Sequence, residues 1–546
     1  MPGTVILNKH DYLSKMEGIL NDRNKFEMIG TPDYYNVFKS QDKINRFLRS
    51  LRKDNIINET TYQELYSTGS SYGILYGLPK IHKPGLPLRP ILASFNTPNY
   101  KLAKFLVPIL EPLTKNSYSL NNSLQFKESI LLQDSDLYMT SLDIESLFTN
   151  IPVGETIELI LNKLFPDPES TFNHFNRTLF KTLLELAVLD TAFVFNGKLF
   201  KQVDGMAMGS PLGPKFANIF MCSLEERMLD DCPLRFHPLF YSRYVDDTFV
   251  LFKGEYEADL FLDYVNTLHP NMKFTIEKEE NNCLSFLDVQ VYRQDNSFNT
   301  TIFRKKTFTG LGSNFYSSCY FNFKINSIFT LLNRALVLSS NWNAFHNEIL
   351  FLVNFFKGNC FPPWLVYKKL NQLLNKHFSR RPVILTVPKM NFYATFPYIS
   401  DLTFQKRFTQ IIHEHFPAIS VKLIPKNPLT IGSLFKIKDQ LCPYMSSGVI
   451  YKYTCPKCIS GIYVGSTSRL LKVRIDSHRG VSFRTGSRIS NPEHSNIRNH
   501  SKQCKTYIEN KYFNVIGHTA SPQDLTILES LFIKLVPSLN THTSAS

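Results

Sequence analysis

Residues 240–252 read FYSRYVDDTFVLF, and the rest of the sequence is best interpreted outward from this stretch. Apolar residues flank Asp246 and Asp247 on both sides, which predicts two buried strands joined by an acidic tip. Adjacent carboxylates at a tight turn repel each other unless a cation binds there. Two divalent metal ions would meet this need, and two-metal sites transfer phosphoryl groups between oxygens. Aspartate is also common in ordinary polar turns, so the remaining motifs must decide between these interpretations.

The composition describes a large, folded and basic protein. At 546 residues the chain is too long for one core, which predicts three or four structural units. Its hydrophobic content of 43% excludes a disordered chain. The 61 Lys and Arg outnumber the 46 Asp and Glu, and a net charge of +15 favours nucleic acid over a membrane as partner. Residues 441–546 hold 13 Lys and Arg against 5 Asp and Glu, about half of this excess.

Targeting signals are weak along the whole chain. The start, MPGTVILNKHDY, lacks an apolar segment long enough for a signal peptide. The apolar run ILFLVNFF at 349–356 stops at eight residues, whereas about 18 are needed to span a bilayer, so no membrane partner is expected. Nine mostly isolated cysteines predict a reducing, intracellular compartment.

Three other segments hold groups that a phosphoryl-transfer site needs. LPKIHKPGLPLRP at 78–90 is kept from being a helix by its prolines, and its basic side chains would form either a clamp on phosphates or a solvated loop. Asp143 ends a predicted strand in LYMTSLDIESLFTNIP at 137–152, where a lone Asp is usually a cap or turn residue. KQVDGMAMGSPLGP at 201–214 has three glycines before a predicted helix, which permit close approach of a backbone or ligand, or form a flexible loop.

Together these pieces predict one active site. Asp143, Asp246 and Asp247 can converge as three carboxylates that hold two Mg²⁺ ions. One ion would lower the pKa of a primer 3′-hydroxyl, and the other would hold the triphosphate and the leaving pyrophosphate. A bulky ring five residues after Asp143 would exclude a 2′-hydroxyl and so favour deoxynucleotides. The other predicted nucleotide contacts are Lys80, Lys83 and Arg89 at the triphosphate, Phe148 at the sugar, and Gln202 with Gly205 beside the templating base pair.

The order and spacing of these motifs resemble reverse transcriptases. LPKIHKP, PLRPI, SLDIESLFTNIP, GMAMGSPLGP, YVDD and LSFLD are most similar to the Penelope-like retroelement proteins, which are related to telomerase reverse transcriptase. The resemblance runs from near Val5 to about Asn343 and implies a right-hand polymerase fold of mixed α/β and α+β class. Such proteins usually carry a longer N-terminal region, so a short form or a truncated copy is expected. The implied units are an N-terminal segment with fingers (1–135), a palm (136–295), a helical thumb (296–380), a connector (381–440) and a nuclease domain (441–546).

The last hundred residues resemble the GIY-YIG nucleases. In GVIYKYTCPKCISGIYVGSTSRLLKVRIDSH the literal Gly-Ile-Tyr at 461–463 is a decoy, because no Tyr-x-Gly follows it at the right distance. The consistent register takes 449–451 as the first element and 463–465 as the second, although Val449 replaces the first glycine. The family positions then fall on Tyr451, Tyr463, Arg474, Glu529 and Asn540.

The resemblance also implies roles for these residues. Glu529 would hold one Mg²⁺, Tyr451 or Tyr463 would help to deprotonate the attacking water, and Arg474 would stabilise charge on the scissile phosphate. Two core tyrosines in a hairpin are the structural alternative.

A zinc site is predicted inside this domain. Cys455-x-x-Cys458 followed by His500-x3-Cys504 can close a tetrahedral Zn²⁺ site, with His494 as the competing ligand. Penelope-like nucleases resemble this chain in carrying such an insert, and a structural metal would stabilise a small basic domain. An unmetallated cysteine pair with surface histidines is the alternative.

The function expected from these motifs is target-primed reverse transcription, in which the nuclease nicks target DNA and the polymerase extends the 3′-end with dNTPs on the element's RNA. The resemblance alone implies the coupling of the two activities. A telomerase-like enzyme that extends existing DNA ends and a non-catalytic nucleic-acid-binding relic are the rivals. A nuclear location follows only from the function. Both Lys273 and Lys278 could protonate the leaving pyrophosphate, and the sequence does not choose between them.

Overall fold

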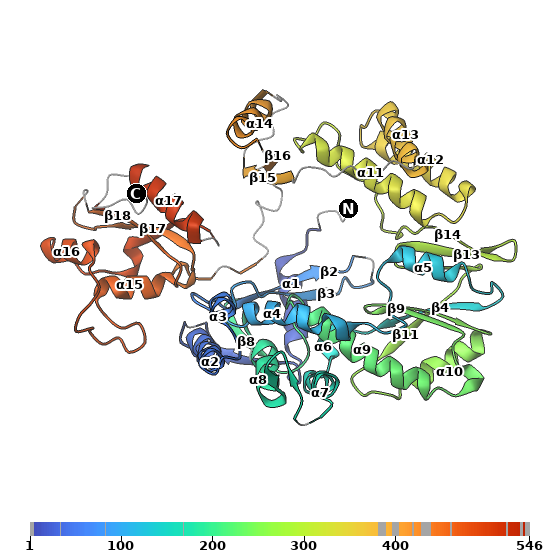
Figure 1. The fold of residues 1–546 in the computed structure, drawn as a ribbon, viewed down its shortest axis with the longest axis horizontal. Helices are drawn as coiled ribbons and strands as arrows, with labels where there is room; N and C mark the ends of the chain where they lie inside the picture. Colours follow the sequence, from blue (N-terminus) through green and yellow to red (C-terminus); the bar gives the residue numbers. More distant parts are fainter. Residues whose placement is uncertain are drawn as a thin grey trace.

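The computed structural model is a mixed α/β protein built from several units (Figure 1). It describes residues 5–32, 34–81, 83–167, 169–189, 191–379, 389–395, 403–417, 420–426, 438–439, 441–458, 461–519, 522–535 and 539–540. Among the helices of these residues, none is both long and apolar enough to cross a bilayer.

A five-stranded sheet near the N-terminus has the strand order β1-β8-β7-β2-β3. Two of its strands, β7 and β8, come from residues 192–202, so the sheet draws on both sides of residue 135. Helix α1 packs on it through Met16 and Leu20, which join the buried core formed with Leu75 and Phe193. The bounds here are α1 (Lys9–Leu20), β1 (Phe26–Gly30), α2 (Tyr34–Lys53), α3 (Glu59–Leu65), β2 (Gly73–Pro79), β3 (Leu88–Ala93), β7 (Ala192–Phe195) and β8 (Lys198–Gln202).

A second sheet, here called the central sheet, has the order β11-β4-β10-β9 and is antiparallel throughout. Side chains of a strand alternate between faces, and both faces of β10 are buried. Val250 and Phe252 join the larger core under the helices, whereas Phe249 and Leu251 join a second core on the opposite face. The strands are β4 (Tyr138–Ile144), β9 (Phe240–Tyr244), β10 (Asp247–Phe252) and β11 (Phe274–Lys278).

The larger core covers one face of the central sheet with helices. Asn176 caps α8 by accepting a hydrogen bond from the Leu179 amide at 2.8 Å. Phe180 of α8 and Phe216 of α9 are fully buried in this core. The elements are α4 (Tyr100–Leu110), η1 (Glu111–Thr114), α6 (Leu147–Asn150), α7 (Val153–Leu164), β5 (Thr171–Phe172), β6 (Phe175–Asn176), α8 (Arg177–Val188), α9 (Gly213–Asp230), η2 (Leu234–Phe236) and α10 (Glu255–Val265).

The second core joins a three-stranded sheet to a helical unit. Phe126 of α5 meets Phe249 of the central sheet with ring centroids 4.9 Å apart and Phe286 of β12 at 4.6 Å. Ile328 and Leu332 of α11 close the same core. Its elements are α5 (Ser123–Ile130), β12 (Cys283–Phe286), β13 (Val289–Gln294), β14 (Ser297–Ile302), α11 (Phe321–Leu338), α12 (Trp342–Gly358) and α13 (Pro363–Phe378).

The C-terminal domain contains a three-stranded antiparallel sheet of order β18-β17-β19. Tyr451 and Tyr453 of its middle strand are fully buried beside Leu471 and Ile475 of α15. A parallel strand pair with one helix precedes this domain. The elements from β15 onward are β15 (Lys389–Thr395), α14 (Thr403–His415), β16 (Ser420–Lys426), η4 (Pro443–Met445), β17 (Val449–Thr454), β18 (Ile462–Thr467), α15 (Leu471–Arg479), α16 (Asn496–Gln503), η5 (Asn510–Tyr512), β19 (Phe513–His518) and α17 (Pro522–Leu535).

Candidate functional site

Three carboxylates meet at one end of the central sheet. The β4–β10 register places Asp143 directly opposite Asp247. Asp246 is the second residue of the two-residue turn between β9 and β10, and Asp247 is the first residue of β10. Cross-strand neighbours in an antiparallel pair lie about 5 Å apart, so the side chains share one small volume. The structure therefore brings together all three aspartates that the sequence singles out.

The electrostatics of this tip favour a cation. Burial, followed by the neighbouring charges of Asp246 and Asp143, raises the pKa of Asp247 to about 6. Burial and Asp143 also raise the pKa of Asp246. Ionised carboxylates that repel each other in a half-buried site are stabilised by hard divalent cations, whose preferred ligands are oxygens. This donor set fits Mg²⁺.

The basic segment 78–90 forms a hairpin end beside the carboxylates. Lys83 Nζ lies 3.7 Å from Asp143 Oδ2. The pKa of Lys80 is lowered mainly by burial and then by the positive charges of Lys83 and Arg89. The carboxylates of Asp143 and Asp246 act in the opposite direction. The structure thus gathers the three predicted basic residues around the acidic tip, where they can attract a polyphosphate.

Phe148 lies on the short helix α6, which follows the strand of Asp143. Ser146 starts this turn in a left-handed conformation, with φ of 54°. The Met206 amide donates a hydrogen bond to the Phe148 carbonyl at 2.7 Å. A Cβ added at Gly213 would lie 3.6 Å from the Phe148 ring, so the glycine-containing loop packs directly against this side chain. These contacts hold the ring against the glycine-containing loop, and its approach to a nucleotide sugar stays a prediction.

Gly205 and Gln202 have structural partners within the protein. Gly205 has φ of +78°, and an added Cβ would meet the Thr149 carbonyl oxygen at 2.5 Å, so no larger residue fits beside α6. The Gln202 side-chain amide donates to the Asp204 carbonyl at 3.2 Å. Both contacts shape the loop against α6, and an approach to a template base stays a prediction.

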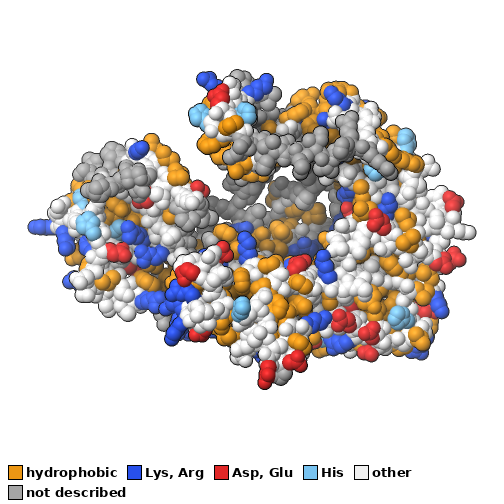
Figure 2. All heavy atoms as spheres, viewed as in Figure 1, with side chains coloured by type: hydrophobic (Ala, Val, Ile, Leu, Met, Phe, Trp, Pro, Cys, Tyr) orange, Lys and Arg blue, Asp and Glu red, His pale blue; other side chains and the backbone are white. Residues whose placement is uncertain are grey.

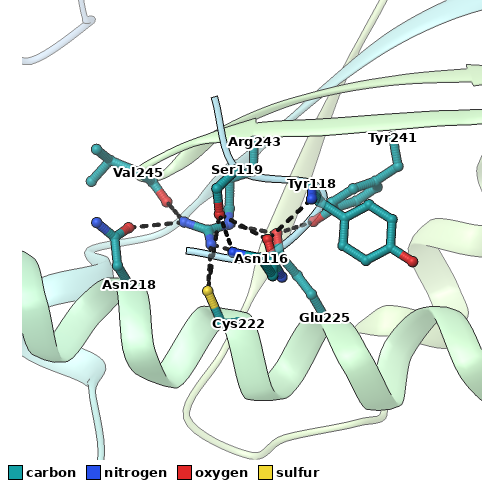
Figure 3. Close-up of polar contacts among 9 residues, drawn as sticks. All are labelled: Asn116, Tyr118, Ser119, Asn218, Cys222, Glu225, Tyr241, Arg243 and Val245. Atoms are coloured by element: carbon teal, nitrogen blue, oxygen red, sulfur yellow. Dashed lines mark hydrogen bonds and ion pairs between the residues drawn. The ribbon is translucent and has the colours of Figure 1, made fainter. Parts of the chain in front are cut away.

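A buried ion pair supports the acidic tip, and the sequence analysis missed it (Figure 3). Arg243 is 1% exposed and binds Glu225 of α9, which is 0% exposed. Asn116 and Tyr241 also donate to the Glu225 carboxylate, at 2.8 and 3.0 Å. Two buried charges are tolerated here because their remaining hydrogen-bonding groups find partners. The signal in the sequence is an arginine two residues before the turn, inside a strand that the sequence predicts to be buried.

Arg243 also contacts the turn itself. Its Nη1 donates to the Val245 carbonyl at 3.0 Å and to Asn218 Oδ1 at 3.0 Å. Val245 has φ of 59°, which is strained for a β-branched residue. The guanidinium thus holds the strained residue that comes immediately before Asp246, and it belongs among the positioning groups of the site.

The structure separates the two lysines proposed for the leaving pyrophosphate. Lys278 binds Glu255 and Asp259 of α10 at 2.8 Å each, and the hydrogen bonds to these carboxylates raise its pKa. Its cross-strand partner is Thr140, three positions from Asp143. Lys273 pairs with Glu145 at 3.4 Å and is exposed near the carboxylate end of the sheet. Lys273 is the better placed of the two.

The residues predicted for a nuclease site also gather in one region, around α15 of the C-terminal domain. Arg474 Nε donates to the Tyr451 hydroxyl at 3.3 Å, and the two tyrosine rings have centroids 6.3 Å apart. Tyr451 Oη lies 2.7 Å from Nε2 of His478, a residue that the sequence analysis did not single out. Its signal was the i, i+4 spacing from Arg474, which places both side chains on one helix face. Burial, together with the nearby positive charges of Arg474 and Arg498, lowers the pKa of His478 to about 3. The ring is therefore neutral at physiological pH.

Glu529 and Asn540 contact the neighbouring strand β18. The Ser466 hydroxyl donates to Glu529 Oε2 at 2.6 Å. Asn540 exchanges two hydrogen bonds with the Val464 backbone, at 3.1 and 2.7 Å. Asn540 therefore satisfies the backbone groups of a sheet edge, which is a structural role in addition to any role at a phosphate.

Four metal-ligand atoms cluster between β17 and α16. The candidate donors of Cys455, Cys458, His500 and Cys504 all lie within 4.8 Å of one another. Cys458 Sγ is 3.2 Å from His500 Nε2 and 3.7 Å from Cys504 Sγ. Three sulfurs and one imidazole at such distances suit a tetrahedral Zn²⁺ ion. The donor set thus fits the predicted metal.

His494, the competing ligand, lies outside this cluster among the described residues. Its Nε2 is 3.2 Å from the Asn499 side-chain amide instead. Gly461 also belongs to the wall of the cluster, since a Cβ there would collide with Cys455 and His500 and approach Cys458 Sγ to 2.9 Å. The absence of a side chain at Gly461 therefore leaves room for the four donor atoms to lie close to one another.

Comparisons with known proteins address the polymerase half. Residues 81–315 match the family model "Reverse transcriptase (RNA-dependent DNA polymerase)", a range that contains all three aspartates. The chain thus contains a reverse transcriptase domain in a mixed α/β multidomain protein. Residues 313–371, which include α11 and α12, match the model "Animal helix-turn-helix domain". No curated protein matches the sequence.

Several solved polymerases are similar in structure at low sequence identity. Telomerase from Candida albicans, in complex with a fragment of telomeric RNA, is 11% identical over 68% of this chain and 72% of its own, with a TM-score of 0.42. A truncated apo telomerase from Candida tropicalis is 15% identical over 42% of this chain and 55% of its own, with a TM-score of 0.33. The Sicinivirus RNA-dependent RNA polymerase is 14% identical over 58% and 71%, with a TM-score of 0.36. The chain thus spans little more than half of the truncated telomerase.

Proposed function

We propose that this protein is the replication enzyme of a Penelope-like retroelement, an RNA-directed DNA polymerase joined to a DNA-nicking endonuclease of GIY-YIG type. The nicked 3′-end would prime copying of the element's RNA from dNTPs, and the site of action would be nuclear. The observation that supports this most directly is the meeting of Asp143, Asp246 and Asp247 with a basic hairpin inside a reverse transcriptase domain.

In the polymerase reaction, Asp143, Asp246 and Asp247 would hold two Mg²⁺ ions. When bound, Mg²⁺ acidifies the primer 3′-hydroxyl and offsets charge on the triphosphate. Lys80 and Lys83 bind the phosphates of the incoming nucleotide, together with Arg89, by charge-assisted hydrogen bonds.

Two further side chains act on the nucleotide. The Phe148 ring occupies the space that a 2′-hydroxyl would need, so deoxynucleotides are preferred. Lys273 donates a proton to the leaving pyrophosphate, because Lys278 is engaged by two carboxylates of α10. Each donated proton is replaced from solvent, to which Lys273 is exposed.

In the nicking reaction, Glu529 would hold one Mg²⁺ and Arg474 would bind the scissile phosphate. Burial raises the pKa of Tyr451 and of Tyr463, so both phenols stay protonated. In this proposal Tyr451 or Tyr463 helps to deprotonate the attacking water by accepting a hydrogen bond from it, and the released proton passes to solvent. His478 Nε2 lies 2.7 Å from the Tyr451 hydroxyl, and its Nδ1 lies 2.8 Å from the Ser495 hydroxyl. Because the pKa of His478 is about 3, this ring orients the Tyr451 phenol and does not take up the proton itself.

The test uses purified full-length protein with Mg²⁺, dNTPs, a primed RNA template and a supercoiled plasmid. Wild type is compared with Asp246→Asn and Glu529→Gln. Loss of DNA synthesis alone in the first variant and of nicking alone in the second supports two separate active sites.

Other outcomes favour other functions. A wild type that extends primers but never nicks DNA would favour a telomerase-like enzyme acting at existing ends. A wild type that binds nucleic acid but does neither reaction would identify a relic of an element and overturn the proposal.

A further inference from the structure

Helix α2 has one strongly basic face. Lys39, Lys43, Arg46 and Lys53 follow a spacing of 4, 7 and 14 residues, which places them on the same side of a helix. All four are exposed, whereas Phe38, Leu48 and Leu51 on the other side are buried. We call these four residues the basic face of α2. Asp42 is the one acidic residue in Tyr34–Lys53.

The C-terminal domain docks against the same helix. The Phe38 and Phe483 rings have centroids 4.7 Å apart, and Leu470 and Val473 complete this small apolar cluster. Arg484 Nη2 lies 2.8 Å from the Asp42 carboxylate. On the C-terminal side, Leu470 caps the start of α15, Val473 lies within it, and Phe483 and Arg484 lie in the loop that follows, so the contact fixes α2 beside the candidate nuclease site.

A second apolar contact strengthens this docking. Met445 packs with Val37, Tyr72 and Val194 of the N-terminal unit in a shared buried cluster. An added Cβ at Gly69 would collide with the Ser468 carbonyl oxygen and come within 2.7 Å of Ser447 Cβ, so the two backbones approach closely here. The two units are therefore packed together and form a continuous surface.

The docking makes the charge of this surface more uniform. Arg484 neutralises Asp42, the acidic residue within the basic face. Among the described residues, no acidic side chain forms an ion pair with Lys39, Arg46 or Lys53. Lys and Arg side chains gather where α2 adjoins the C-terminal domain (Figure 2). A surface on which basic side chains predominate is the electrostatic footprint of a bound polyanion.

We propose that the basic face of α2 binds the phosphate backbone of the duplex DNA that the C-terminal domain nicks. This inference rests on the proposed nuclease function. Val473 packs against Phe38 of α2, and the next residue, Arg474, lies in the candidate nuclease site. The basic face therefore lies beside the site that would cut DNA, which favours DNA over the RNA template as the bound polyanion. From Lys39 to Lys53 the helix rises about 21 Å, the axial length of roughly six base pairs. The face thus extends the DNA contact beyond the small nuclease domain.

The experiment measures binding to a 30-base-pair duplex in Ca²⁺, by fluorescence anisotropy, over a series of salt concentrations. The full-length Glu529→Gln protein is compared with the same protein carrying Lys39→Gln, Arg46→Gln and Lys53→Gln. We expect affinity for the duplex to fall roughly tenfold or more, and the slope of log K against log[salt] to decrease by about 2 to 3, since each lost phosphate contact removes about 0.9.

Matched controls separate this effect from general loss of charge. Arg235→Gln with Lys253→Gln removes exposed positive charge on the central unit, and it is expected to leave the slope unchanged. A primed RNA template serves as the second probe. The inference would be overturned if the triple variant bound the duplex as tightly as the Glu529→Gln protein does. It would also be overturned if the triple variant lost affinity only for the RNA template. Absence of nicking in wild type would overturn the nuclease proposal while leaving this binding result interpretable.

Discussion

The carboxylate tip of the central sheet and the polar cluster of the C-terminal domain are supported in different ways. Asp247 is placed by a strand whose two faces belong to two large cores, and by the buried Arg243–Glu225 pair behind the turn. Tyr451 and His478 lie in a domain with a small core, next to four metal-ligand side chains. The comparison teaches that two large apolar cores and one buried ion pair can fix a charged site, whereas a domain with a small core relies more on polar contacts and on the metal that its four donors could hold.

The largest expected effect tests the metal cross-link. Cys458→Ser, or removal of Zn²⁺ by a chelator, should unfold the C-terminal domain, since structural zinc contributes on the order of 10 kcal/mol to small domains. Hydrogen exchange should then lose protection in 449–518 and keep it in 138–252. Primer extension is expected to continue while nicking stops. Unchanged protection in both regions after complete metal removal would show that the cysteine cluster is not a structural metal site.

The next effect tests the buried ion pair. Arg243→Ala leaves Glu225 charged and unpaired, which should cost about 3–5 kcal/mol in the free energy of unfolding of the central unit, measured by urea titration. Arg243→Met with Glu225→Leu should recover most of this stability, because apolar replacements of a buried pair are often neutral.

The double variant also separates stability from positioning. Its kcat for primer extension should stay well below wild type, since the Val245 carbonyl has lost its donor, while its KM for dNTP should change little. Recovery of both stability and kcat in the double variant would assign the pair a purely structural role.

A smaller effect concerns pH and the C-terminal domain. The pKa of His478 is about 3 in the folded protein, below its ordinary value, so the folded state disfavours the protonated ring. Its contribution to stability is complete above pH 6.5 and is lost as pH falls toward 3. Wild type should lose about 2 kcal/mol of local stability in 471–479 between pH 6.5 and 5, measured by hydrogen exchange. His478→Gln should lose markedly less over the same interval, and an equal loss would exclude His478 as the cause.

The smallest effect concerns nucleotide selection. Phe148→Ala should raise the use of ribonucleotides about tenfold relative to deoxynucleotides, because selection by shape in a pocket is worth about 1–3 kcal/mol. The ratio of kcat/KM values for a ribonucleotide and its deoxy counterpart measures this directly. Phe148→Tyr, which keeps the ring, is the matched control and should retain the preference for deoxynucleotides.

The sequence predicted those features that depend on local pattern. The apolar run broken by Asp246 and Asp247 indicated a two-strand tip, and the prolines around Lys80 and Lys83 indicated a basic hairpin. The spacing of Cys455 and Cys458 indicated a metal site. In each case the chemistry lies within a short segment, where alternation or spacing can be counted.

Among features that depend on distant partners, only those carried by a recognised motif order were predicted, such as the convergence of Asp143 with Asp246 and Asp247. The sequence did not predict the strand register that sets Asp143 opposite Asp247, nor the burial of Arg243, which depends on α9. His478 becomes a partner of Tyr451 only when α15 packs on the sheet. The docking of Phe483 on Phe38 joins the two ends of the chain. Long-range packing of this kind leaves no periodic trace in a single sequence.

The burial of β10 on both faces has a consequence for insertions and deletions. Removing one residue between Thr248 and Phe252 would send every following side chain into the wrong core, so neither core could repack by a local adjustment. Lys253, just beyond the strand, is exposed, and length changes there would leave the register intact. A library of single-residue indels across 240–260 should therefore show a sharp border of tolerance at the end of this strand.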